Sequence, residues 1–214
     1  MPELTPDELL TTTRSVRKRL DLTRPVDPAL VRECLEIALQ APSGSNAQRW
    51  HWLVLTDPGK RRRMGAIYQK ACRAYLDSPN AAGRLYANDP ARSQVQGRVN
   101  DSVAHLADRM GEVPVLVVPC LRIPSGELPE GNQAGLWGSV LPAAWSYMLA
   151  ARSRGLGTAW TTLHLAHEEE AAQVLGLPAD VRQAALIPTA HYTGETFKRA
   201  PRTPLDEVLH ENGW

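Results

Sequence analysis

Residues 139–162, SVLPAAWSYMLAARSRGLGTAWTT, contain the most apolar helix that the sequence predicts. A helix over residues 139–153 has Pro142 near its first turn, where proline is tolerated. The Gly-Leu-Gly stretch at 155–157 is typical of a helix end, and residues 158–162, rich in Thr and Trp, predict a short strand. An apolar helix that leads directly into a strand indicates that helices pack against a sheet.

Similar patterns continue on both sides of this stretch. Thr5, Pro6 and Glu8 predict a helix start with a capping box, and this helix is expected to end near Leu20. Further helices are predicted over residues 28–41, 60–76, 93–110 and 168–175, and strands over residues 52–56, 113–120 and 184–192. Because helices and strands interleave, the sequence predicts an α+β or α/β fold in a single domain, residues 1–214. Residues 60–110 hold few large apolar side chains, so we expect them to cover the core rather than build it.

Composition excludes several classes of protein. The formal net charge of +1 provides no broad field for nucleic acid or membrane surfaces. Apolar runs such as VPVLVVPC are too short to span a bilayer. The three cysteines are far apart without a CxxC pair, which argues against a disulfide framework. The N-terminus, MPELTPDELL, lacks the apolar region of a signal peptide. We therefore expect a cytoplasmic protein with no nucleic-acid or membrane partner and no metal site.

Arg14, Ser15 and Arg17 are the first candidate binding residues. On a helix, residues three apart share a face, so both guanidinium groups would converge beside a hydroxyl. Such a set suits a phosphate, which accepts charge-assisted and bidentate hydrogen bonds. A solvated basic helix surface is the alternative, since Lys18 and Arg19 follow directly.

The loop APSGSNAQ at residues 41–48 is the second candidate. Small residues let backbone N–H groups approach a ligand closely, and several residues add side-chain donors and acceptors. Such a loop could hold a flat heterocycle by its polar edge; the alternative is an elaborate turn whose Ser and Asn satisfy one another. The candidate residues are Pro42, Ser43, Ser45, Asn46 and Gln48.

Two further stretches carry weaker signals. Thr161 and Thr162 could line a site, although Thr is also a common strand residue. Neither GxGxxG nor GxxxxGK[ST] occurs in the chain. In the tail, Lys198, Arg199 and Arg202 lie among prolines and could return to the same anion as Arg14 and Arg17.

In order and spacing, four stretches together resemble the nitroreductase family of FMN-dependent oxidoreductases. These are TTTRSVRKRL at 11–20, APSGSNAQRW at 41–50, residues 139–162 quoted above, and PRTPLDEVLH at 201–210. The resemblance implies an α+β fold with a central mixed, mainly antiparallel sheet flanked by helices. It also implies an intertwined homodimer with FMN at the interface, so that each site uses both chains. Residues 61–110 are expected to be a variable helical cap over the substrate.

The resemblance also implies roles for individual residues. Arg14, Ser15 and Arg17 would hold the FMN phosphate and the pyrimidine end of the ring, and Arg202 would return to the phosphate. The 42–48 residues named above would edge the ribityl chain and isoalloxazine, and Gly157, Thr161 and Thr162 would lie near the reactive face. The chain departs from many members at Thr13, where they carry a basic residue, and at Arg49, where they carry proline.

The implied activity is transfer of reducing equivalents from NAD(P)H through FMN to a small acceptor such as a nitroaromatic or quinone, in ping-pong order. No protein side chain is expected to be a catalytic nucleophile or dedicated acid, because in such enzymes the protein binds and orients the cofactor. Reductive dehalogenation and flavin breakdown are alternatives on the same scaffold. Non-catalytic flavin binding or storage is a third alternative.

Overall fold

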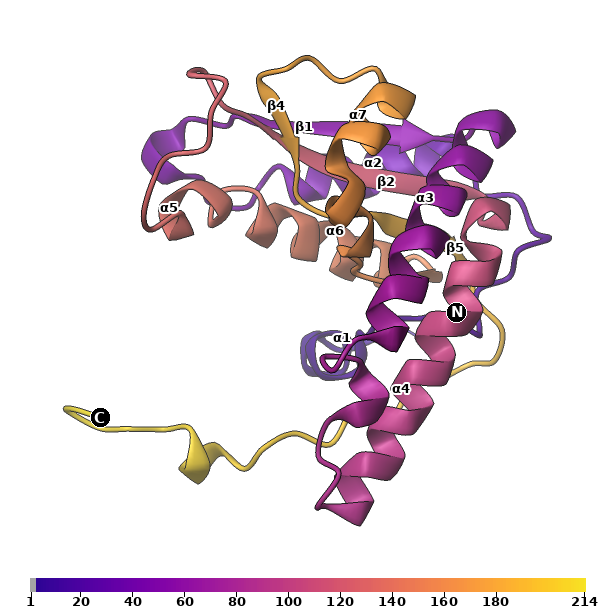
Figure 1. The fold of residues 1–214 in the computed structure, drawn as a ribbon, viewed down its shortest axis with the longest axis vertical. Helices are drawn as coiled ribbons and strands as arrows, with labels where there is room; N and C mark the ends of the chain where they lie inside the picture. The colour runs from indigo at the N-terminus through magenta and orange to yellow at the C-terminus, as the bar shows by residue number, and fades with distance from the viewer. Residues whose placement is uncertain (1–2) are drawn as a thin grey trace.

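A central antiparallel sheet organises the computed structural model, which describes residues 3–214 (Figure 1). Its five strands are β1 (Trp50–Leu55), β2 (Val115–Arg122), β3 (Leu156–Thr158), β4 (Val181–Gln183) and β5 (Ile187–His191). The order across the sheet is β1-β2-β5-β3, and β4 pairs with the end of β2. The predicted antiparallel sheet flanked by helices is confirmed.

Strand β2 is the centre of the core because both of its faces are covered. Val115 and Val117 pack with α2 (Pro28–Ala38) and α6 (Leu141–Ser153) on one side. Leu116, Val118 and Cys120 point to the other side and pack with α3 (Pro58–Asp77), α4 (Pro90–Arg109) and α7 (Glu168–Leu175). The alternation follows from the two-residue period of a strand.

The starts of four helices follow rules that the sequence displays. Thr5 caps α1 (Pro6–Thr12) with the predicted capping box. Asp27, Asp57 and Asp89 each accept a hydrogen bond from the first turn of the helix that follows, and each precedes a proline at the first helical position. The chain also forms short α5 (Ala134–Trp137) and 3-10 turns at Gly44–Asn46, Ala82–Arg84, Met110–Glu112, Leu163–His167 and Leu205–Glu207.

The prediction that the first helix runs to Leu20 was wrong. Helix α1 ends at Thr12, and Thr13 is extended, with its hydroxyl donating to the Leu9 carbonyl at 2.6 Å. Three consecutive β-branched threonines at 11–13 weaken helix propensity there. The chain after Thr13 gains more by pairing with β3, where Ser15 forms a bridge to Thr158.

Two strand predictions also need correction. The strand predicted at 158–162 lies at 156–158 and continues only as an isolated bridge from Thr161 to Leu186. The strand predicted at 184–192 is β5, preceded by the separate short strand β4. Glycine 155, at φ 76°, ends α6 one residue before β3 begins, so the expected helix end is confirmed.

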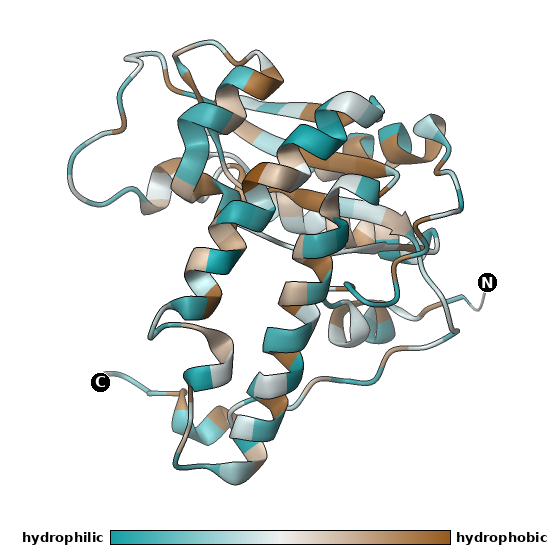
Figure 2. Ribbon diagram, turned by 45° about the vertical axis from the view of Figure 1, so that its right-hand side comes forward, coloured by the Kyte–Doolittle hydropathy of each residue, from teal (hydrophilic) through white to brown (hydrophobic). Residues whose placement is uncertain are grey.

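Helices α3 and α4 form an antiparallel pair that extends from the sheet (Figure 2). Their sheet-proximal halves supply Met64, Tyr68 and Leu106 to the core, each at most 1% exposed. The prediction that residues 60–110 add little to the core was therefore wrong, because their few large apolar residues are concentrated where the helices meet the sheet. The far ends project beyond the sheet, and the role of residues 61–110 as a cap stays a prediction.

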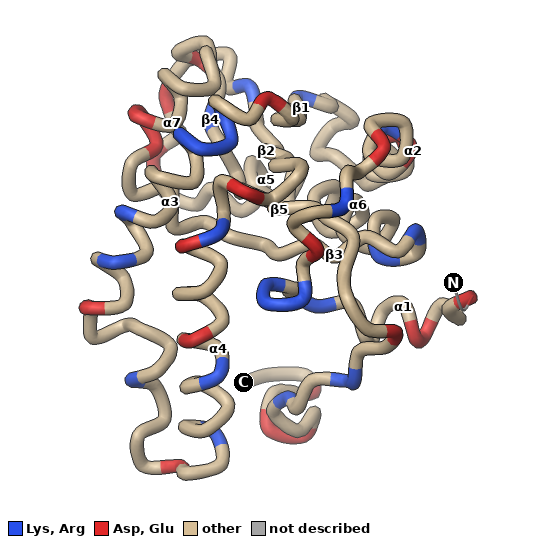
Figure 3. The backbone as a smooth tube through the Cα atoms, turned by 90° about the vertical axis from the view of Figure 1, so that its right-hand side faces the viewer, with Lys and Arg blue, Asp and Glu red and all other residues tan. Residues whose placement is uncertain are grey.

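No helix in residues 3–214 has the length and hydropathy to span a membrane. Basic and acidic residues, blue and red in Figure 3, are scattered along the backbone of the helices, the loops and the tail.

The contact between α3 and the Met110–Glu112 turn depends on Gly65. A methyl group at Gly65 would lie 2.5 Å from the Gly111 nitrogen and 2.7 Å from the Gly111 Cα, both of which are backbone atoms. We expect Gly65→Ala to destabilise the protein by about 3 kcal/mol, because backbone must shift to relieve the overlap. Urea unfolding followed by circular dichroism measures the change.

Gly97 in α4 is the matched control, since a methyl group there meets no atom within 4 Å. Gly97→Ala is expected to stabilise the protein by about 0.5–1 kcal/mol, the difference in helix propensity. Equal unfolding midpoints for Gly65→Ala and wild type would show that the two backbones are not in close contact.

Candidate functional site

The segment of residues 13–17 lies along the edge of the sheet beside β3. The Val16 nitrogen donates to the Thr158 carbonyl at 2.7 Å, and Ser15 bridges to the same residue. Gly157 allows this approach, because a methyl group there would lie 3.1 Å from the Val16 Cβ. The structure thus places Gly157 beneath the segment, as a buried packing residue.

Arg17 extends from this segment into a largely enclosed environment. Its Nη1 donates to the Ser102 hydroxyl on α4 at 3.4 Å, whereas its Nε is buried and has no hydrogen-bond partner. Burial lowers the pKa of Arg17, Tyr68 nearby opposes the shift, and the positive charge of Arg14 adds to it. Among residues 3–214, Arg17 forms no ion pair. A partly buried guanidinium with a buried, spare Nε donor and no acid partner is suited to receive an anion.

Arg14 is exposed and lies close enough to Arg17 for their charges to interact. Its Nη1 donates to the carbonyl oxygen of Lys198 at 3.2 Å, which brings the C-terminal tail to the segment. Arg202 is exposed, and its Nη1 donates to the neighbouring Pro201 carbonyl at 3.1 Å. Within one chain, the structure joins the tail to Arg14 but does not bring the Arg202 side chain to it.

The loop of residues 42–48 is exposed and has an unusual backbone. Ser45, Asn46 and Gln48 have φ angles of 53°, 52° and 48°, a region that side chains rarely adopt. Local hydrogen bonds hold this shape: the Ser43 hydroxyl accepts from the Gln48 nitrogen at 3.1 Å, and Asn46 Oδ1 accepts from Gln48 Nε2 at 2.8 Å. Three such residues in one loop mark stored backbone strain, which proteins concentrate at binding sites.

The 13–17 segment and the 42–48 loop lie at opposite corners of the sheet. The segment pairs with Thr158 of β3. Thr158 lies opposite Thr189 of β5, and Thr189 in turn lies opposite Val115 at one end of β2. The loop enters β1 at Trp50, level with Leu121 at the other end of β2 and at the far edge of the sheet. Strand spacing and rise separate them by about 20 Å across the sheet and about 20 Å along it. One chain therefore does not bring the two predicted halves of the site together (Figure 1).

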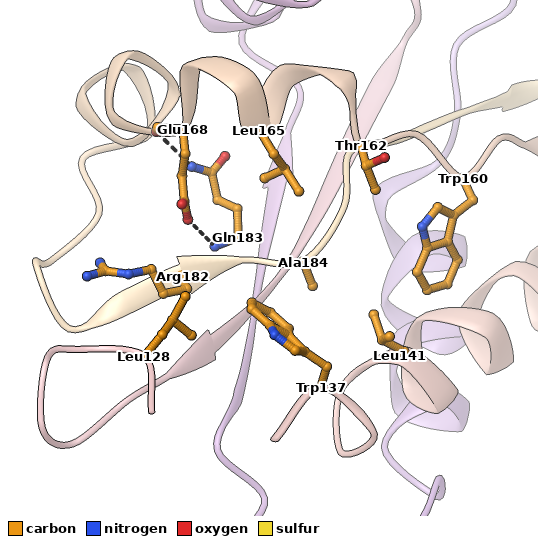
Figure 4. Close-up of a pocket in the computed structure, with 10 residues that line it drawn as sticks. All are labelled: Leu128, Trp137, Leu141, Trp160, Thr162, Leu165, Glu168, Arg182, Gln183 and Ala184. Atoms are coloured by element: carbon orange, nitrogen blue, oxygen red, sulfur yellow. Dashed lines mark hydrogen bonds between the residues drawn. The ribbon is translucent and has the colours of Figure 1, made fainter. Parts of the chain in front are cut away.

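A pocket of about 270 Å³ lies between α5, the start of α6, β4 and the turn before α7 (Figure 4). Two indole rings and three leucines supply most of its wall, and Thr162 is the predicted site residue that reaches it. Thr161 is buried instead, and its hydroxyl donates to the Leu186 carbonyl at 2.6 Å. The lining residues are Leu128, Trp137, Leu141, Trp160, Thr162, Leu165, Glu168, Arg182, Gln183 and Ala184.

The polar side of this pocket was not predicted as a site from the sequence. Glu168 Oε1 accepts from the Gln183 nitrogen at 3.1 Å, and the Glu168 carbonyl accepts from Gln183 Nε2 at 3.1 Å. Arg182 Nη2 donates to the Gly126 carbonyl at 2.8 Å, which holds the loop that carries Leu128. These residues meet because β4 pairs with β2, and β4 is too short to give a strand pattern.

His164 precedes the pocket residue Leu165 and is fully buried, and neither ring nitrogen has a hydrogen-bond partner. Burial lowers the pKa of His164 to about 4. As the pH falls, His164 binds a proton near pH 6.5 in the unfolded chain but only near pH 4 in the folded chain. The free energy of unfolding therefore decreases as the pH drops from 6.5 to 4. Between pH 7.5 and 5, linkage predicts a loss of about 2 kcal/mol from this residue.

His164→Leu is expected to remove that part of the pH dependence, because the substitution deletes the titrating ring. Urea unfolding at pH 7.5 and 5 gives the two free energies. His105→Leu, at an exposed position on α4, is the control that should keep the wild-type slope. An unchanged slope in His164→Leu would show that His164 does not cause it.

Comparisons with known proteins agree on the family. A model of the nitroreductase family matches residues 10–191. A protein named NADH dehydrogenase from Thermus thermophilus is 28% identical over 215 aligned residues, covering 92% of this chain and 90% of that protein. Among solved structures, an FMN and NADPH-dependent nitroreductase from Sphigopyxis sp. strain HMH is 25% identical, covers 99% of this chain and 100% of its own, and superposes with a TM-score of 0.65.

A second solved structure, an iodotyrosine deiodinase bound to FMN and 3-iodo-L-tyrosine, shares the fold. It superposes with a TM-score of 0.72 at 18% identity and covers 97% of this chain and 99% of its own. Since the family match extends over most of the chain, this protein belongs to the nitroreductase family.

Proposed function

We propose that this protein is an FMN-dependent oxidoreductase that moves reducing equivalents from NAD(P)H to a small acceptor such as a nitroaromatic or quinone. The observation that carries the proposal is the buried, unpaired donor of Arg17 beside Arg14. Family membership supports an oxidoreductase. The cofactor and the electron donor are inferred from relatives whose names state FMN and NADPH.

The residues present fit an FMN phosphate on one side and a flavin ring on the other. Arg14, Ser15 and Arg17 supply two cations and a hydroxyl, and Arg17 Nε lacks the partner that an anion would provide. The strained 42–48 loop presents amide and hydroxyl groups to solvent, as a polar ring edge requires. Thr162 and the indole of Trp160 share one pocket and would lie on the ring side.

We infer a homodimer, which the separation of these two halves supports, because the loop of a second chain could meet the arginines of the first. Exposed apolar side chains on α1, α2 and α6 offer a surface for this contact, since α1 and α2 both pack on α6. Further exposed apolar residues lie in the tail. The set is Leu10, Ile37, Leu39, Trp145, Leu205, Val208 and Leu209.

Bound FMN would supply the redox chemistry, accepting electrons from NAD(P)H and passing them on. The chain would bind and orient it: Arg17 would favour negative charge at the pyrimidine end of the ring, and Arg14 and Ser15 would hold the phosphate. We assign no protein nucleophile or general acid. Arg17 contacts Ser102 of α4, and the far ends of α3 and α4 project beyond the sheet. We propose that they cover the acceptor, which is the cap role for residues 61–110.

An absorption spectrum tests the proposal. The purified protein is mixed with FMN, desalted, and then reduced anaerobically with NADPH or NADH. Retained flavin bands that bleach with either donor and return with a quinone or nitroaromatic are expected. Retained flavin that neither donor bleaches would indicate a binding or storage protein. A colourless protein after desalting would overturn the proposal, and recovery with an iodotyrosine alone would indicate reductive dehalogenation.

A further inference from the structure

Two arginines enclose the base of the C-terminal tail. The guanidinium carbon of Arg19 lies 4.1 Å from the centre of the Phe197 ring, and the guanidinium carbon of Arg152 lies 4.8 Å from the same centre. Tyr192 packs against Phe197 at 4.9 Å between ring centres, and Arg152 Nη1 donates to the Tyr192 hydroxyl. We call Arg19, Arg152, Tyr192 and Phe197 the tail clamp. Phe197 is the one phenylalanine in the sequence.

The Arg19 guanidinium also holds the turn that precedes Phe197. Its Nε donates to the Thr193 carbonyl at 2.6 Å, and its Nη1 donates to the Thr196 carbonyl at 2.8 Å. Gly194 has a φ angle of 77°, and a methyl group there would lie 2.6 Å from Arg19 Nη2. The turn therefore wraps closely around this cation and requires glycine at its centre.

The clamp contains two positive charges and no carboxylate. Arg152 is 7% exposed, its Nε has no hydrogen-bond partner, and neither arginine forms an ion pair among residues 3–214. Two aromatic faces provide the compensating negative potential. A buried cation with no acid partner is unfavourable for the stability of the fold. This points to a role of the clamp in positioning the tail.

Beyond the clamp, two more contacts fix the tail. The Lys198 carbonyl accepts from Arg14 Nη1 at 3.2 Å, and the Thr203 hydroxyl accepts from Arg92 on α4 at 3.1 Å. The tail accordingly passes behind α4 in Figure 1 and lies beside α4 in Figure 3. Lys198, Arg199 and Arg202 lie in the stretch of chain between these two contacts, and all three are exposed.

We propose that the tail clamp consists of positioning residues that hold residues 198–202 beside Arg14, so that the tail cations strengthen binding of a phosphate monoester there. This inference rests on the proposed function, in which that group is the phosphate of FMN. The clamp does not contact the phosphate. It acts indirectly, because it fixes the direction of the backbone that continues into residues 198–202. Loosening the clamp should reduce the contribution of the phosphate to FMN affinity and leave the contribution of the flavin ring unchanged.

Flavin binding separates these two contributions, because riboflavin has the same ring and no phosphate. Dissociation constants are measured by quenching of flavin fluorescence in the dimeric, full-length protein. Phe197→Leu is expected to weaken FMN binding about tenfold, which corresponds to the loss of one charge-assisted contact. The dissociation constant of riboflavin should stay unchanged. The FMN dissociation constant should also become less sensitive to salt. Phe197→Tyr keeps an aromatic face between the arginines and should restore both properties.

Glycine variants provide a second, matched comparison. Gly194→Ala displaces Arg19, whereas Gly131→Ala places the same side chain at a φ of 78° with no atom within 4 Å. Gly194→Ala should behave as Phe197→Leu does, and Gly131→Ala as wild type. Trypsin cleavage after Lys198 or Arg199, measured without flavin, should accelerate in Gly194→Ala and Phe197→Leu only.

The outcomes distinguish the two proposals. Wild-type protein that binds FMN, together with Phe197→Leu that has the same FMN-to-riboflavin ratio, would overturn the clamp inference and leave the proposed function standing. Wild-type protein that binds neither flavin would overturn the proposed function and the phosphate role of the clamp together. Equal cleavage rates in all variants would show that the clamp does not hold the tail.

Discussion

Replacing Arg17 by methionine is expected to weaken FMN binding about 100-fold, or about 2.7 kcal/mol, the loss of one or two charge-assisted hydrogen bonds in a partly dehydrated environment. The Arg17 side chain is already desolvated and held by Ser102, so little ordering is needed when an anion arrives. The reduction potential of the bound flavin should also fall, because a cation near the ring favours the reduced, more negative form. Fluorescence titration and anaerobic dye equilibration measure the two quantities.

The same substitution should not destabilise the protein without cofactor. Arg17 Nε has no partner, and removing a buried, unpaired cation relieves a desolvation cost. We therefore expect the free energy of unfolding of the flavin-free protein to stay constant or rise slightly. Lys18→Met, at the exposed next position, is the control and should change neither property. Unchanged FMN affinity and potential in Arg17→Met would exclude Arg17 from the site.

Local rules explain which parts of the fold were predictable. A Thr or Asp cap followed by proline starts four helices, and these starts depend only on neighbouring residues. The end of α1 was not predictable in this way, because the competing partner of Ser15 is Thr158, far away in sequence. Long-range strand pairing determined where local helix propensity stopped.

In the candidate site, too, features set by neighbouring residues were predictable and features set by long-range contacts were not. Arg14 and Arg17 were chosen on helical spacing, yet they belong to an extended segment, and Arg17 is buried by contacts from α4. The pocket joins Glu168 to Gln183 through β4, whose three residues carry no recognisable pattern. The sequence predicted a small-residue polar loop at 42–48, but not the positive φ angles of Ser45, Asn46 and Gln48. Assignment of these residues to FMN stays a prediction.

Mixed dimers give the strongest test of a site shared by two chains. One variant is Arg17→Met. The other is Asn46→Gly with Gln48→Gly, which removes two amides where glycine adopts positive φ without strain. Each homodimer should lose FMN, because both of its sites contain one damaged half. Co-expression with two affinity tags isolates the dimer that contains one chain of each kind.

If the arginines of one chain face the loop of the other, as we propose, the two defects of that mixed dimer fall on the same site. The second site then combines the intact Arg17 with an intact loop. We expect about one FMN per dimer with wild-type affinity, where wild type binds about two and each variant homodimer binds little at micromolar concentration. Flavin absorbance per protein after desalting gives the count. If each site used a single chain, both sites of the mixed dimer would carry one defect and bind little FMN. Because the loop and the arginines lie about 20 Å apart in two directions within one chain, we expect the first result.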